Sequence, residues 1–236
     1  MAKYYSFVYS SFAVDFKAAL EDYYGDGVSV TSASGTEIQF SCPQICDKPL
    51  RIWNYKDSST PSIMLQGSCN GVTFISGSPW DGGSVLQPYH LVLADNFLLL
   101  QLVDSGVNTD SSAILIAKLT NGRSLCLGSR SHTNSQGVPY FTDDATIRPI
   151  WFMAPSQKKL RAGKKIPIVK SYLAIGSEME LNADGTLAYI DGLYLTAEHN
   201  LGGVVGMNYF LSHDIFRGNN TNGIYMPNAF YVELEV

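Results

Sequence analysis

The sequence predicts a mainly β protein, a hairpin-rich β-sandwich or barrel-like fold, with one amphipathic helix near the N-terminus. Three observations lead to this prediction. Asn-Gly and Asp-Gly dipeptides recur between β-rich runs, one early segment has helical periodicity, and the chain ends in a strictly alternating strand. The chain has 236 residues, of which 45% are hydrophobic, and this is enough to bury a substantial core.

The expected helix begins after Ser11, a suitable N-cap residue, and ends at Gly25. Between these two positions apolar side chains recur at helical spacing, at Phe12, Phe16, Ala19, Leu20 and Tyr23. Because they share one face, we expect the helix to pack on a sheet.

Hairpin turns are predicted at four dipeptides whose residues readily adopt the positive φ angles of tight turns. They are Asn70-Gly71, Asn121-Gly122, Asp184-Gly185 and Asp191-Gly192. The last two bracket residues 186–190 and predict a compact meander. In the final segment, 230–236, apolar and polar residues alternate, so one face of this strand should be buried and the other wet.

The domain organisation is expected to be a larger β-rich subdomain over residues 1–154, including the helix, and a smaller β subdomain over 166–236. A basic loop or linker, 155–165, separates them. The alternative, a single domain with a long loop at 155–165, stays open.

Charge and hydropathy restrict the classes of partner. Charged residues make up only 16% and the net charge is −5, which disfavours nucleic-acid binding. The low charge suits either a surface covered in an assembly or a polar, uncharged β surface. The longest apolar stretch, 90–103, is interrupted by Asp95 and Asn96 and is too short to span a bilayer, and the N-terminus does not resemble a secretory signal. We therefore expect a soluble chain with no membrane partner.

The four cysteines, Cys42, Cys46, Cys69 and Cys126, are too sparse for a disulfide scaffold. Alternation with Ile38 and Phe40 places Cys42 on a core face, and Cys126 lies in a similar pattern. Cys42 and Cys46 have a spacing found among zinc ligands, but no second pair of ligands with matching spacing follows. We expect buried, reduced thiols and predict no metal site.

The search for catalytic residues leads to no enzyme. Residues 67–71 have the Gly-x-nucleophile-x-Gly spacing of a hydrolase elbow with Cys69 as nucleophile, but a strand and not a helix is expected after them. Ser212, His213 and Asp214 are neighbours along the chain and cannot adopt triad geometry. The sequence predicts no catalytic and no cofactor-binding residues.

Two features are candidate partner contacts. Basic residues gather around the expected linker and suit docking on an acidic partner; they are Lys158, Lys159, Arg161, Lys164 and Lys165. Trp80, in a loop rich in Gly, Pro and Asp, could stack on a sugar or anchor a protein interface.

Several strings in the C-terminal third, and one in the middle of the chain, carry a family resemblance. They are residues 171–176, 189–195, 202–206, 208–210, 230–234 and 94–100. In these strings the chain resembles virion structural proteins, the tail, baseplate or neck components of phages and prophages of Gram-positive bacteria, and of related contractile injection systems. The resemblance implies a β-rich subunit, made in the host cytoplasm and located in the virion, that self-associates and contacts other particle proteins.

The low charge, the many hairpins and the lack of catalytic residues also suit such a subunit. Open sheet edges, such as the C-terminal strand, would then be capped by neighbouring copies. Two alternatives remain: a β-sandwich that recognises a glycan or cell surface through Trp80, and a thiol hydrolase that uses Cys69.

Overall fold

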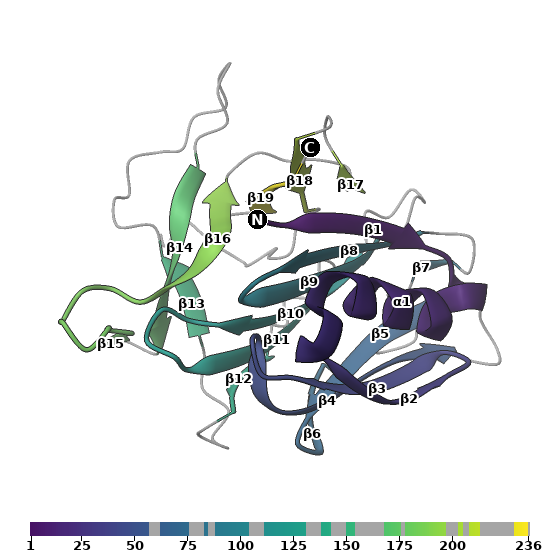
Figure 1. Cartoon of the computed structure of the whole chain (residues 1–236). Coiled ribbons are helices and arrows are strands. Elements are labelled where there is room, and N and C mark those ends of the chain that lie inside the picture. Colours follow the sequence, from purple (N-terminus) through teal and green to yellow (C-terminus); the bar gives the residue numbers. More distant parts are fainter. Residues whose placement is uncertain are drawn as a thin grey trace.

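The fold consists of three antiparallel sheets and one α-helix in the described part of the chain (Figure 1). The computed structural model describes residues 1–56, 62–75, 83–84, 88–103, 111–130, 138–142, 150–153, 168–175, 178–196, 203–204, 208–212 and 229–235. The predicted mainly β class with one N-terminal helix is therefore confirmed.

The three sheets are named by their place in the chain. The central sheet has the strand order β1 (Lys3–Phe7), β8 (Tyr89–Ala94), β9 (Phe97–Val103), β10 (Ser111–Lys118), β11 (Ser124–Arg130), β12 (Val138–Phe141). The N-terminal sheet has the order β2 (Ser29–Ser34), β3 (Glu37–Cys42), β4 (Cys46–Lys56), β5 (Ser62–Cys69), β6 (Val72–Ile75), with β7 (Gly83–Ser84) also paired to β5. The C-terminal sheet has the order β13 (Ile150–Met153), β14 (Ile168–Ile175), β16 (Tyr189–Thr196), β19 (Ala229–Glu233), β18 (Tyr209–Leu211), β17 (Gly203–Val204), with β15 (Glu178–Met179) also paired to β14.

The helix α1 (Phe12–Tyr24) lies where the sequence predicts it, between the 3-10 turns η1 (Tyr9–Ser11) and η2 (Gly25–Gly27). Gly25 adopts a φ of +52° at its C-cap. Ser11 is the N-cap residue, but its hydroxyl donates to the carboxylate of Asp15 and does not cap a backbone N–H. No helix among the described residues combines the length and apolarity needed to cross a membrane.

The central sheet is buried on both faces. On one face, residues such as Leu91, Leu98 and Ile114 pack in a core with α1 and the N-terminal sheet. On the other, residues such as Val92 and Leu115 pack against the C-terminal sheet. A strand covered on both faces needs apolar residues at successive positions, which explains the near-continuous apolar stretch 90–103.

Three of the four predicted turns form as expected, and the fourth does not. At the β5–β6 hairpin Asn70 and Gly71 adopt φ angles of +48° and +80°. Turns also form at Asn121-Gly122 and Asp184-Gly185. Asp191-Gly192 instead lies inside β16, where the register against β14 shifts between Lys170 and Tyr172. The positive φ of Gly192, +75°, serves a β-bulge here, so the predicted turn at this dipeptide is wrong.

The C-terminal strand β19 shows the predicted alternation, with Phe230 and Val232 buried and Glu233 exposed. It lies between β16 and β18, so the expectation that it forms an open sheet edge is wrong. The linker 155–165 lies outside the described residues. The C-terminal sheet includes β13, which precedes residues 155–165 in the chain. This sheet shares a hydrophobic core with the central sheet.

Candidate functional site

The residues that the sequence singles out for partner contacts fall outside the part of the chain that the structure describes. They are Lys158, Lys159, Arg161, Lys164, Lys165 and Trp80. Their role stays a prediction. The next basic residue, Lys170 on β14, is exposed, and its Nζ lies 3.9 Å from the centre of the Tyr189 ring.

Three cysteines that are far apart in the sequence meet in the interior and form what we name the thiol cluster: Cys46, Cys69 and Cys126. Their Sγ atoms all lie within 4.8 Å of one another, and the Sγ atoms of Cys46 and Cys69 are 3.7 Å apart. All three are free thiols, and each side chain is at most 1% exposed. The cluster joins two sheets, because Cys46 and Cys69 belong to the N-terminal sheet and Cys126 to the central one.

Local structure explains the position of each thiol. Cys42 and Cys46 flank the tight turn 43–45 and are register partners across it. In this turn the Ile45 N–H donates to the Cys42 carbonyl at 3.1 Å. Cys69 is the last residue of β5, directly before the turn at Asn70, whose N–H donates to the Pro49 carbonyl at 2.9 Å.

Cys126 reaches the cluster through the alternation of β11. Its neighbours Leu125 and Leu127 face the C-terminal sheet, so Cys126 faces the N-terminal one. A nearby polar contact holds the two sheets together at this end, since the Thr142 hydroxyl donates to Asp47 Oδ1 at 2.7 Å.

The three thiols have different affinities for their protons. Hydrogen bonds with Cys126 and Cys69 lower the pKa of the Cys46 thiol, while burial acts in the opposite direction. Desolvation, and then the hydrogen bonds with the other two thiols, raises the pKa of Cys126 well above its ordinary value. The pKa values of Cys46 and Cys126 are therefore shifted in opposite directions.

The sequence predicts buried, inert cysteines, and burial of all four is confirmed. It does not reveal that three of them meet. The hairpin predicted at Asn70-Gly71 instead of a hydrolase elbow at Cys69 is also confirmed, because strand β6 follows the turn. The alternation of apolar residues along each strand predicts which face of the sheet a cysteine side chain lies on. It does not predict that Cys126 lies opposite Cys46, because this depends on how the two sheets pack.

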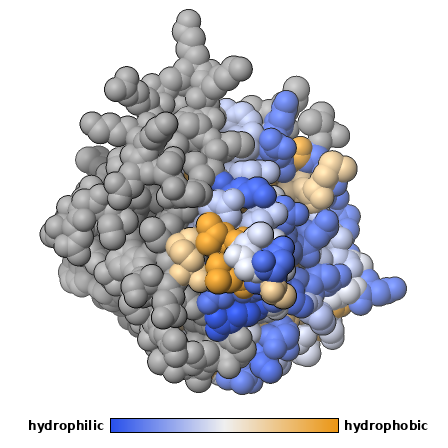
Figure 2. Space-filling model, turned by 90° about the vertical axis from the view of Figure 1, so that its left-hand side faces the viewer, coloured by the Kyte–Doolittle hydropathy of each residue, from blue (hydrophilic) through white to orange (hydrophobic). Residues whose placement is uncertain are grey.

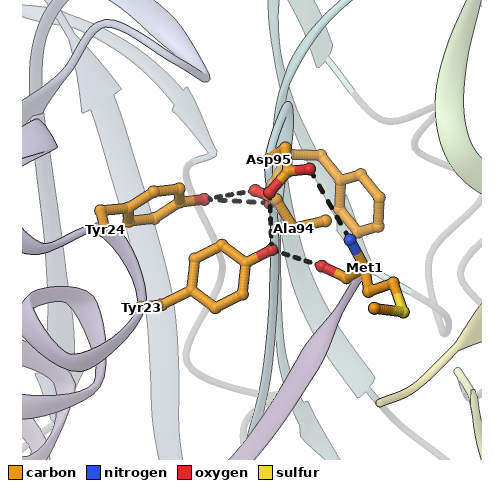
Figure 3. Close-up of polar contacts among 6 residues, drawn as sticks. Met1, Tyr23, Tyr24, Ala94 and Asp95 are labelled. Atoms are coloured by element: carbon orange, nitrogen blue, oxygen red, sulfur yellow. Dashed lines mark hydrogen bonds and ion pairs between the residues drawn. The ribbon is translucent and has the colours of Figure 1, made fainter.

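A second candidate is a surface cavity of about 420 Å³ beside the β8–β9 turn. Carboxylates of Asp95, Asp191 and Glu233 line it together with Lys118. Tyrosines of α1 approach the same turn (Figure 3): the Tyr23 hydroxyl donates to Asp95 Oδ1 at 3.0 Å.

The contacts beside this cavity serve the fold. The hydroxyl of Tyr24 donates to the Ala94 carbonyl at 2.8 Å, and the hydroxyl of Tyr23 also donates to the Met1 carbonyl (Figure 3). These contacts join α1 to the central sheet. The cavity lining combines three carboxylates with one lysine. The thiol cluster is the better-formed of the two sites.

Comparison of the sequence with protein-family models and with curated proteins finds no match.

Proposed function

We propose that this chain is a structural subunit of a phage or phage-like particle, which acts by self-association and by contacts with other virion proteins. The resemblance in the C-terminal third and the charged fraction of only 16% support the proposal from the sequence. A subunit covered by its neighbours needs fewer charges on its own surface.

The surface limits the kind of contact that such a subunit can use. Figure 2 shows the side that faces left in Figure 1, where hydrophobic residues form only small areas among hydrophilic ones in the described part. Leu181, 51% exposed, is one of few large apolar side chains in the described residues that are open to solvent. For the described residues of this face, association through backbone hydrogen bonds fits better than burial of a broad apolar patch.

Strand β2 carries the proposal. It is an edge strand of the N-terminal sheet and, within the described residues, the longest of the edge strands. Four of its six residues, Ser29, Thr31, Ser32 and Ser34, are exposed, and it contains neither a charged residue nor a proline. Proteins usually protect an edge with charged residues, proline or a β-bulge. Strand β2 has neither of the first two, and its register against β3 shifts between Val30 and Ser32, so residues 32–34 are the regular part of this edge and are suited to pair with a strand of another copy.

The test compares the mass in solution of the wild-type chain and of Ser32→Lys, by light scattering on a sizing column at two concentrations. We expect a wild-type mass that is a multiple of 25.8 kDa, and a shift toward the monomer in the variant, since a charge on the edge opposes strand pairing. Ser10→Lys is the matched control: Ser10 is also exposed but lies in η1, outside the sheets.

Two results would contradict association through β2. One is a monomer at both concentrations for all three proteins. The other is an oligomer of the same size in the wild type and in Ser32→Lys, which would move the contact elsewhere on the chain.

A further inference from the structure

The thiol cluster has the dimensions of a metal site. Zinc binds cysteine sulfur at about 2.3 Å, so two thiolates of a tetrahedral site are separated by about 3.8 Å. The Sγ atoms of Cys46 and Cys69 are 3.7 Å apart, and Cys126 completes a triangle with no side above 4.8 Å. A disulfide would instead bring two sulfurs to about 2.05 Å, and all these thiols are free.

A fourth sulfur is close to the cluster. Cys42 is directly opposite Cys46 across the β3–β4 turn, so its side chain lies on the same face of the sheet. Its Sγ donates to Gln44 Oε1 at 3.2 Å, and Gln44 is exposed. To act as a fourth ligand, this sulfur would exchange its hydrogen bond with Gln44 for a bond to the ion.

The tight β3–β4 turn fixes the spacing of two of these cysteines. The Ile45 N–H donates to the Cys42 carbonyl at 3.1 Å, and Cys42 and Cys46 are register partners on the two sides of the turn. Two cysteines separated by three residues at a tight turn also have a spacing found in structural zinc sites.

We propose that the cluster is a structural site for a single thiophilic divalent ion of the zinc class, with Cys46, Cys69 and Cys126 as three ligands and Cys42 as the fourth. Binding forms metal–sulfur bonds and releases the thiol protons to solvent, with no change of oxidation state. The ion would connect the β3–β4 turn, the end of β5 and the central sheet. This inference does not depend on the proposed assembly function.

The burial of the cluster determines how the ion must be loaded. Each of the four cysteines is at most 1% exposed, so their sulfurs are shielded from solvent in the folded chain. The ion therefore enters while the sheets come together, and metal binding stabilises the folded chain.

The test refolds the full-length, reduced chain with Co²⁺, with Zn²⁺ or with a chelator. We expect one Co²⁺ per chain after desalting, sulfur-to-cobalt charge-transfer absorption in the near ultraviolet, and displacement of Co²⁺ by Zn²⁺. The thermal midpoint should be higher after refolding with Zn²⁺ than with the chelator. A chain that refolds to its native circular dichroism and retains no Co²⁺ overturns the proposal, whatever the variants do.

The variants then assign the ligands. Cys126→Ala should weaken Co²⁺ binding by at least about tenfold, since even the loss of an outer-shell group costs that much. Cys42→Ser should retain Co²⁺ with weaker charge-transfer absorption, because three sulfurs remain. Ser124→Ala, a substitution at another buried position of β11, is the matched control and should bind like the wild type. Equal Co²⁺ binding by Cys126→Ala and by the wild type would contradict the assignment.

Discussion

Gly67 on β5 allows the N-terminal and central sheets to approach each other closely. A Cβ at this position would lie 2.6 Å from Cε2 of Phe74 and 3.1 Å from Cδ1 of Ile114, inside the packed core. Neither neighbour can move away freely, because Phe74 and Ile114 are at most 1% exposed. At the residue scale, this position needs glycine for space and not for backbone conformation.

We expect Gly67→Ala to lower the free energy of unfolding by about 1–3 kcal/mol through overpacking. The measurement is urea unfolding followed by tryptophan fluorescence. Gly27→Ala is the matched control. A Cβ at position 27 would lie 2.9 Å from Cδ of Gln44, but the Gln44 side chain is exposed and can turn away. Equal losses in the two variants would show that the close approach at Gly67 does not restrict side-chain size.

His90 on β8 should make stability depend on pH. Burial lowers the pKa of this imidazole, whose Nδ1 lies 2.8 Å from the Tyr4 hydroxyl and whose ring lies beside Phe210. The native state favours neutral histidine, while in the unfolded chain the group titrates near about 6.5. The unfolded state therefore binds more protons between the two pKa values, and stability is lost as the pH falls through that window.

The measurement is the urea midpoint at about pH 7.5 and about pH 5, in the wild type and in His90→Gln. Glutamine does not titrate, so the midpoint of the variant should fall less between the two pH values. An equal fall in both proteins would assign the acid sensitivity to other groups, such as Glu37, whose pKa is lowered by the hydrogen bond from Arg51.

At the scale of elements, α1 is held by one apolar face. Its buried residues are Phe12, Ala13, Phe16, Ala19, Leu20 and Tyr24. The ring of Phe16 packs against those of Phe7, Phe12 and Phe40, so the helix contacts both the central and the N-terminal sheets. Val14 is on the opposite face and is 68% exposed.

We expect Phe16→Ala to destabilise the protein by about 3–5 kcal/mol, because it opens a cavity in the core under the helix. Val14→Ala should change the free energy of unfolding by no more than about 0.5 kcal/mol, because the Val14 side chain is largely exposed to solvent. Thermal unfolding followed by circular dichroism measures both. A loss for Val14→Ala as large as that for Phe16→Ala would mean that the outer face of α1 is also packed.

For the whole molecule, the central sheet couples the two cores. Ile114 and Leu115 are neighbours on β10, yet Ile114 packs with the N-terminal sheet and Leu115 with the C-terminal sheet. Both are at most 1% exposed. Loss of either core exposes one face of the same strands, so the described sheets should unfold together.

We expect Ile114→Ala and Leu115→Ala each to lower the stability of a single unfolding transition by about 2–5 kcal/mol. Near-ultraviolet and far-ultraviolet circular dichroism, recorded on the same denaturant series, should give coincident curves for each variant. Two separated transitions, of which Leu115→Ala shifts only one, would instead support independent subdomains on the two sides of segment 155–165.

The sequence by itself determined the features that depend on neighbouring residues. The limits of α1 follow from the spacing of Phe12 and Phe16 and from Gly25, and the β5–β6 hairpin follows from Asn70-Gly71. These are local choices of backbone angle and of apolar period, which a short stretch of chain makes largely alone.

The tertiary structure decided which elements lie side by side. Asp191-Gly192 has the residues of a turn but forms a bulge, because β16 continues along β14. Strand β19 has the alternation of any half-buried strand, and only pairing with β18 makes it an inner strand. The convergence of Cys126 with Cys46 and Cys69 likewise requires two sheets to stack. A sequence pattern specifies which face of a strand is apolar, but the partner for that face is selected by the packing of the whole chain.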